Sequence, residues 1–127
     1  MNKAIFYWKT LVCSVLMLIL FLVPTNNIST VPSVPGISEL IHVFMFALFT
    51  WFFLRDRVRI GGLIRPSLNN YIVAILLSFL FGITIELLQK FSGFGRSAEY
   101  LDVVYDVSGS LLAAGIIMVY YRIKPVD

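Results

Sequence analysis

Charged side chains are scarce in this chain, where Lys, Arg, Asp and Glu make up 13% of 127 residues. A soluble domain usually carries about 25% charged residues, so the composition argues against one. The single cysteine, Cys13, excludes an intramolecular disulfide. The sequence has neither paired cysteines nor an H-E-x-x-H motif, which are common signs of zinc sites. We therefore predict no metal site, although His42, Glu39, Glu86 and Asp102 are conceivable ligands, and we assign no cofactor.

Hydrophobic residues are abundant instead, at 59% of the chain. They form four runs, at about residues 4–23, 37–54, 71–88 and 103–121. An α-helix needs about 20 apolar residues to cross the hydrocarbon of a bilayer. We predict an all-α membrane protein, an antiparallel bundle of four transmembrane helices forming a single domain over residues 1–127. So small a bundle is also a candidate for homo-oligomer formation.

The first run has two interpretations, a signal peptide or an uncleaved membrane span. Lys3 and Lys9 precede its most apolar part, as in a signal peptide. The sequence that follows, Pro24–Ile28, lacks a small-x-small cleavage pattern. We favour the uncleaved span.

Basic residues predict the orientation of the bundle. Eight of the ten lie at the termini or between the second and third runs. Lys90 and Arg96 lie between the third and fourth runs, and residues 24–36 contain none. Cytoplasmic loops carry the excess of Lys and Arg, so we place both termini in the cytoplasm of a multi-pass cell-membrane protein. The net charge of +3 then reflects membrane insertion, and we predict no nucleic-acid partner.

Five of the seven carboxylates lie at the ends of apolar runs, on the predicted extracytoplasmic side: Glu39, Glu86, Glu99, Asp102 and Asp106. The other two, Asp56 and Asp127, lie in a basic segment and at the last residue. Helical spacing places His42 on the face of Glu39 and Gln89 on the face of Glu86. Arg96 precedes the last three acids. Because charge beside hydrocarbon is costly and usually functional, we predict one polar cleft open to the outer face.

Two roles are open for this cleft. The groups could be polar glue between helices. However, only Arg96, Lys90 and a protonated His42 oppose five carboxylates, and such groups suit proton transfer or cation binding. We therefore favour a functional site. The candidates for catalysis or binding are His42, Glu86, Gln89, Arg96 and Asp102, and those for binding alone are Glu39, Glu99 and Asp106.

The order of these residues resembles a known family. The set comprises His42, E-x-x-Q at 86–89, G-R-S at 95–97, Asp102 and Gly109. It is similar to the pattern of the VanZ-like bacterial membrane proteins, and the likeness covers about residues 37–115. Two positions depart from it: Glu39 stands where members usually carry Lys, and Asp106 where they usually carry Asn. Both departures make the site more acidic.

The resemblance implies a bacterial envelope protein, since the family is named after a protein associated with resistance to the glycopeptide teicoplanin. Three functions follow. The outward cleft could bind or modify a lipid-linked or glycolipid envelope component and lower glycopeptide access. The chain could be a membrane-embedded hydrolase or transferase with Glu86 or Asp102 as general base. It could be a small proton- or cation-coupled transporter, or an accessory subunit of one. We favour the first, with membrane lipids or a lipid-linked component as partner, and leave open whether it is an enzyme.

Overall fold

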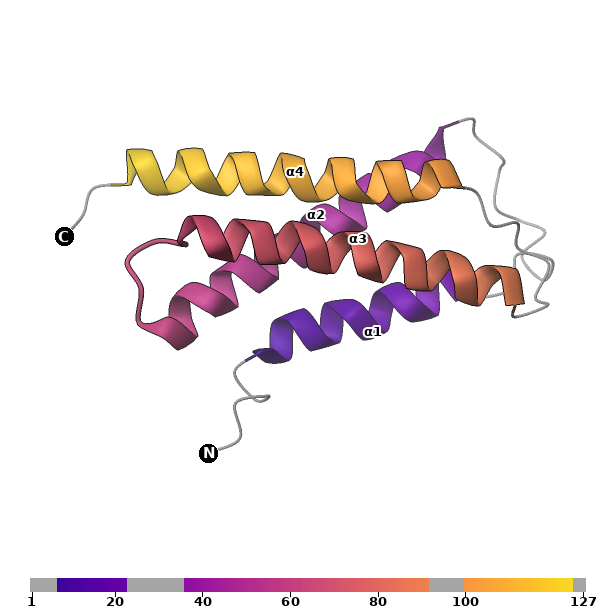
Figure 1. Cartoon of the computed structure of the whole chain (residues 1–127), viewed down its shortest axis with the longest axis horizontal. Coiled ribbons are helices and arrows are strands. Elements are labelled where there is room, and N and C mark those ends of the chain that lie inside the picture. The colour runs from indigo at the N-terminus through magenta and orange to yellow at the C-terminus, as the bar shows by residue number, and fades with distance from the viewer. Residues whose placement is uncertain (1–6, 23–35, 92–99, 125–127) are drawn as a thin grey trace.

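The computed structural model describes residues 7–22, 36–91 and 100–124, which fold into four α-helices. They are α1 (Trp8–Leu22), α2 (Ile37–Gly61), α3 (Leu68–Phe91) and α4 (Tyr100–Ile123). Consecutive helices run in opposite directions, and α2 crosses behind α3 and α4 (Figure 1). α2 packs most extensively against α4, while α1 contacts α2 and α3. The predicted all-α antiparallel bundle is confirmed.

Three of the helices, α2, α3 and α4, are long and apolar enough to cross a membrane. α1 has 15 residues and is therefore about 22 Å long, short of the roughly 30 Å of hydrocarbon. The span predicted at 4–23 begins and ends outside the described residues. The start of α1 and the end of α4 lie at the same end of the bundle (Figure 1). Which side of the membrane that end faces stays a prediction.

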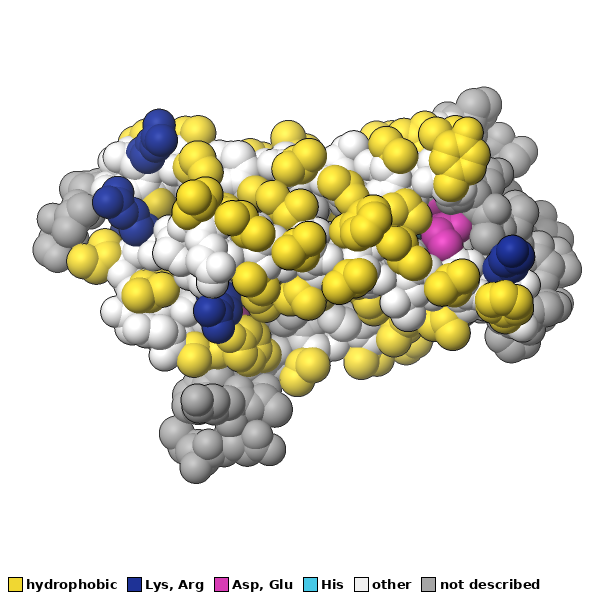
Figure 2. Space-filling model, in the orientation of Figure 1, with side chains coloured by type: hydrophobic (Ala, Val, Ile, Leu, Met, Phe, Trp, Pro, Cys, Tyr) yellow, Lys and Arg dark blue, Asp and Glu magenta, His cyan; other side chains and the backbone are white. Residues whose placement is uncertain are grey.

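The surface of the bundle is apolar, as lipid contact requires. Leu40, Leu80 and Leu112 are each more than half exposed. On the face drawn in Figure 2, apolar side chains cover the middle and charged side chains lie towards the two ends. Several polar side chains, including Thr50 and Ser78, are instead fully buried. This inversion is what a bundle surrounded by hydrocarbon needs, because its polar groups must find partners inside.

α2 extends seven residues beyond the predicted end of the second run, from Leu54 to Gly61. Gly62 ends the helix in the left-handed conformation (φ 59°), and the N–H of Leu63 donates to the carbonyl of Val58 at 3.0 Å. This is a Schellman ending. Three of the four arginines between the second and third apolar runs therefore lie on the last turns of α2: Arg55, Arg57 and Arg59. Arginine is a good helix former, so the helix continues where the apolar run stops.

Two apolar clusters fill the interior. One joins α1, α2 and α3 through Cys13, Met17, Phe21, Phe46, Phe49 and Ile85. The other joins α2, α3 and α4 through Phe53, Leu54, Tyr71, Ala74, Ala114 and Ile117. Three hydroxyls also link the helices inside the bundle, since Thr50 lies 3.1 Å from Ser78 and donates to Ser110 at 2.8 Å.

α2 and α4 approach each other closely at Gly109. A Cβ added at this glycine would overlap the backbone carbonyl of Val43, the residue after His42. The crossing therefore brings the first turns of α4 against the beginning of α2. That contact positions the candidate site.

Candidate functional site

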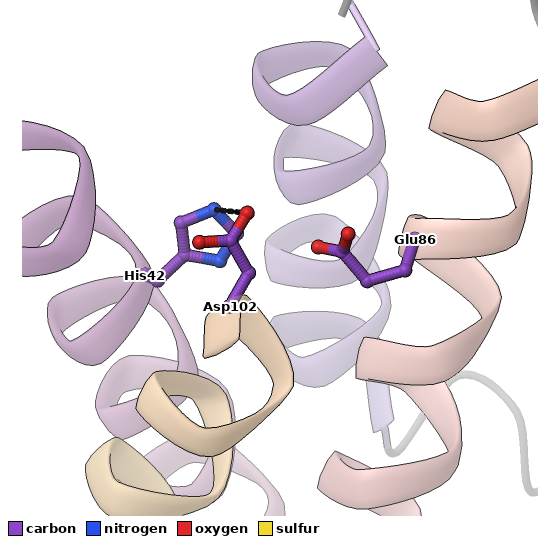
Figure 3. Close-up of side chains that lie close together, drawn as sticks. All are labelled: His42, Glu86 and Asp102. Carbon is purple, nitrogen blue, oxygen red and sulfur yellow. Dashed lines mark ion pairs between the residues drawn. The ribbon is translucent and has the colours of Figure 1, made fainter. Parts of the chain in front are cut away.

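Four ionisable side chains from three helices meet at one end of the bundle. His42 comes from the first half of α2, Glu86 from the last two turns of α3, and Asp102 and Asp106 from the first two turns of α4. We call these four residues the carboxylate–histidine cluster. In Figure 3, the side chains of Glu86 and Asp102 point towards the imidazole from α3 and α4.

The imidazole of His42 is fixed by Asp106. His42 is 1% exposed and Asp106 is 0% exposed, and Nδ1 lies 2.7 Å from Oδ1. With Asp106 ionised, its carboxylate only accepts hydrogen bonds, and Nδ1–H is then the donor. The ring of Phe21 stacks on the imidazole with 4.3 Å between centroids. The ring is thus held in both position and orientation.

The other ring nitrogen, Nε2, faces the remaining two acids. It lies 3.7 Å from Oδ2 of Asp102, which is beyond hydrogen-bond length (Figure 3). One ligand atom each of His42, Glu86 and Asp102 lie within 4.8 Å of one another. Nε2 is buried and makes no hydrogen bond with any described residue. Glu86 is buried, whereas Asp102 is 15% exposed and so lies towards the surface.

A glycine makes room for Asp106. A Cβ at Gly82 on α3 would lie 2.7 Å from Oδ2 of Asp106, too close for a real contact. Gly82 was not among the predicted site residues. Its position four residues before Glu86, and so on the same helical face, was the available signal. No sequence signal indicated that Phe21 would cover the imidazole.

The other predicted site residues lie apart from the cluster or outside the described chain. Gln89 is buried, and its amide donates to the backbone carbonyl of Phe21 at 2.8 Å, joining α3 to the end of α1. Glu39 is half-buried in the first turn of α2, with no hydrogen bond or ion pair to another described residue. Arg96 and Glu99 fall outside the described residues.

A third buried acid among the described residues, Asp56, lies near the opposite end of α2. It is 2% exposed and accepts hydrogen bonds from the backbone N–H and the hydroxyl of Thr10, at 3.3 and 2.8 Å. Arg59 pairs with its other oxygen at 3.2 Å. With both oxygens bonded, Asp56 is a structural link between α1 and α2. Its position in a basic segment of the sequence gave no indication of this role.

The cluster has two chemical capacities. An imidazole that donates one N–H to a buried carboxylate has its second nitrogen oriented for accepting a proton or binding a cation. Two further carboxylates lie beside that nitrogen. A serine nucleophile is not indicated among the described residues, since Ser108 is exposed and donates to the carbonyl of Val104 in its own helix.

Comparison with known proteins identifies the family. No curated protein and no solved structure matches the chain significantly. The family model described as VanZ/LLP1 matches residues 4–121. This match spans nearly all of the chain, including α1, α2, α3 and all but the last two residues of α4. The membrane protein described here therefore belongs to the VanZ/LLP1 family.

Proposed function

We propose that this VanZ-family envelope protein binds, within a multi-pass bundle, the polar head of a lipid-linked or glycolipid component at its carboxylate–histidine cluster. The observation that carries the proposal is the buried His42, held through Nδ1 by Asp106 with Nε2 facing Glu86 and Asp102. The cluster lies at one end of apolar helices, where a lipid head group in the same membrane can reach it. Asp102, at 15% exposed, is the most exposed of the four side chains.

The polar contacts of the bundle support a binding site at the cluster, in preference to a purely structural role between helices. The hydroxyls of Thr50, Ser78 and Ser110 bond to one another, as glue does. In the cluster, by contrast, Nε2 of His42 and Oδ2 of Asp106 are buried without a hydrogen-bond partner among the described residues. A buried polar atom without a partner costs about 1–3 kcal/mol. Retaining such atoms is favourable if a ligand supplies the missing partner.

The distribution of charge supports an extracytoplasmic position for the cluster. The arginines of α2 lie near the end of the bundle opposite to His42. By the positive-inside rule, that end faces the cytoplasm. The cluster then opens towards the cell wall, where lipid-linked envelope components are exposed and glycopeptides act.

A second candidate function is enzymatic. A histidine oriented by a buried carboxylate is the arrangement of a general base, as in many hydrolases. In this reading, Nε2 of His42 takes the proton of a water molecule or a hydroxyl group that attacks the lipid-linked substrate. The bonded pair of His42 and Asp106 favours this candidate over catalysis by Glu86 or Asp102 alone.

The experiment compares cells that carry the gene, lack it, or carry the Glu86→Gln or Asp102→Asn variant. Glycopeptide tolerance, total lipids and cell-wall fragments are measured in each. We expect both variants to behave as the deletion at normal protein abundance. Thr84→Val is the matched control, because Thr84 lies on the exposed side of α3 and bonds only within that helix.

The results separate the two candidates and can reject both. A modified lipid or wall fragment that depends on Glu86 and Asp102 indicates the enzyme. Altered glycopeptide tolerance with unchanged lipids indicates binding. If both variants retain wild-type tolerance and wild-type lipid and wall profiles, or lose them only in proportion to lost protein, the proposal is wrong.

A further inference from the structure

The groups around Nε2 of His42 favour a positive charge beside this nitrogen. Since Nδ1–H donates to Asp106, the neutral imidazole presents the lone pair of Nε2. This lone pair is buried and faces an oxygen of Asp102 at 3.7 Å, with Glu86 beside it. Carboxylate oxygens and a nitrogen lone pair repel one another. They lie together favourably when a cation sits between them.

We infer that His42, Glu86 and Asp102 bind one divalent transition-metal cation, with Nε2 and one oxygen of each carboxylate as ligands. Zinc bonds to nitrogen and oxygen are about 2.0–2.1 Å long, so tetrahedral ligand atoms lie about 3.3–3.4 Å apart. The distance of 3.7 Å between Nε2 and Asp102 is only a few tenths wider. The third ligand atom lies within 4.8 Å of the others, a gap that rotation of the Glu86 side chain can close.

The types of ligand define the class of metal. One imidazole nitrogen with two carboxylate oxygens suits Zn²⁺ or Mn²⁺. Ca²⁺ prefers six to eight oxygen ligands. The absence of a zinc motif in the sequence does not conflict with this site, because the three ligands come from three different helices. Spacing along one segment therefore carries no sign of them.

Asp106 is a positioning residue in this site. Metal-binding histidines almost always donate their second ring N–H to a carboxylate, a carbonyl or water, which fixes the tautomer and raises ligand basicity. The bond of 2.7 Å from Nδ1 to Asp106 is such a contact. Gly82 leaves the space in which the Asp106 carboxylate lies. The inner ligands and their support are thus both present in the bundle.

A bound cation would also define the kind of ligand in the proposed function. This extension of the metal site rests on that function. Three protein ligands leave at least one coordination position open. An anionic oxygen, such as a lipid-linked phosphate, can fill that position, although carboxylates alone would repel it. The metal would thereby connect an acidic site to an anionic head group.

The test uses the full-length chain, purified in detergent through a tag without histidine and stripped with a chelator. His42 is the only histidine, so ¹⁵N-histidine labelling gives the signals of one imidazole ring. The protein is titrated with Zn²⁺ while binding and the ring ¹⁵N signals are followed. We expect one Zn²⁺ per chain and a large change at Nε2, while Nδ1 stays protonated. Mn²⁺ should broaden the same signals.

Variants connect the binding to the named ligands. Glu86→Gln and Asp102→Asn should weaken Zn²⁺ binding by about 100-fold or more, and Asp106→Asn by about 10- to 100-fold as an outer-shell change. Asp56→Asn is the carboxylate control, because Asp56 is also a buried acid but is bonded to Thr10, away from the cluster. Its affinity should equal that of the wild type. If a ligand variant does not fold, the Zn²⁺ titration of the wild-type protein alone tests the inference.

Two results would overturn the inference: no saturable binding of Zn²⁺ or Mn²⁺ by the wild type, or an Nε2 that remains protonated at saturating Zn²⁺. In the second case, a proton alone supplies the positive charge. A negative result for metal binding is distinct from a negative result for the proposed function. Without metal binding, loss of tolerance in Glu86→Gln cells would still support the proposed function.

Discussion

Gly82 on α3 and Asp106 on α4 share one space in the bundle: the Asp106 carboxylate occupies the position that a side chain at 82 would need. A Cβ there would lie 2.7 Å from Oδ2. The same carboxylate holds His42 through its other oxygen. The orientation of the imidazole therefore depends on the absence of a side chain on a different helix.

Replacing Gly82 by alanine should disturb the cluster without preventing folding, because a carboxylate at the end of a side chain can move. The shift strains the bond between Asp106 and His42, and leaving such a buried bond unmade costs about 1–3 kcal/mol. We expect that decrease in the free energy of unfolding in detergent, together with loss of glycopeptide tolerance. Gly115→Ala is the matched control, since a Cβ at Gly115 meets open space. It should leave stability unchanged or raise it by up to about 1 kcal/mol through helix propensity. Equal effects of the two substitutions would contradict this account.

Asp106→Asn and Asp106→Ala should differ. The amide oxygen of asparagine can still accept the Nδ1–H of His42, whereas alanine leaves that buried donor without a partner. We expect Asp106→Ala to lower the free energy of unfolding by about 1–3 kcal/mol more than Asp106→Asn. Denaturant titrations of both proteins in the same detergent measure the difference. If the two variants are equally stable, the bond does not orient the ring as described.

Thr50→Val tests the buried hydroxyls separately from the cluster. Valine keeps the shape of threonine and removes the hydroxyl that contacts Ser78 and Ser110. Hydrogen bonds between membrane helices contribute about 0.6 kcal/mol on average and about 1.7 at most. We expect a loss of stability in that range with unchanged glycopeptide tolerance, measured beside Thr84→Val. Loss of tolerance in a stable Thr50→Val protein would show that these hydroxyls belong to the functional site.

Cysteine labelling of intact cells tests the orientation. In a Cys13→Ser background, a reagent that stays outside should label Phe94→Cys, in the segment between α3 and α4. It should not label Leu63→Cys, in the exposed connection between α2 and α3. The reason is the excess of basic residues on the side of Leu63. Labelling of position 63 alone would place the carboxylate–histidine cluster in the cytoplasm.

The helices could be predicted from the sequence because long apolar runs have few alternatives to a helix in a membrane. The end of α2 could not be predicted, because hydropathy shows where a helix leaves the hydrocarbon and not where its backbone hydrogen bonds end. Arg55 and Arg59 are charged and helical at once. The buried link between Asp56 and Thr10 was missed for the same reason.

The shared depth of the acids could also be predicted from the sequence, because Glu86, Asp102 and Asp106 lie at the ends of apolar runs on the same side of the predicted bundle. The separate roles of the three acids could not be predicted in this way. That Asp106 binds Nδ1 while Asp102 faces Nε2 depends on how α4 is rotated against α2. The close approach at Gly109 sets this rotation, and one sequence carries no measure of it.

The two bonds that hold α1 bear on how the protein is made. Thr10 bonds to Asp56, and the Phe21 carbonyl, near the end of α1 where intrahelical partners run out, bonds to Gln89. These partners lie 46 and 68 residues later in the chain. At about 5–20 residues per second of synthesis, the first helix made waits several seconds for its polar partners. The helix made first is therefore the one that stays longest without its interhelical polar partners during synthesis.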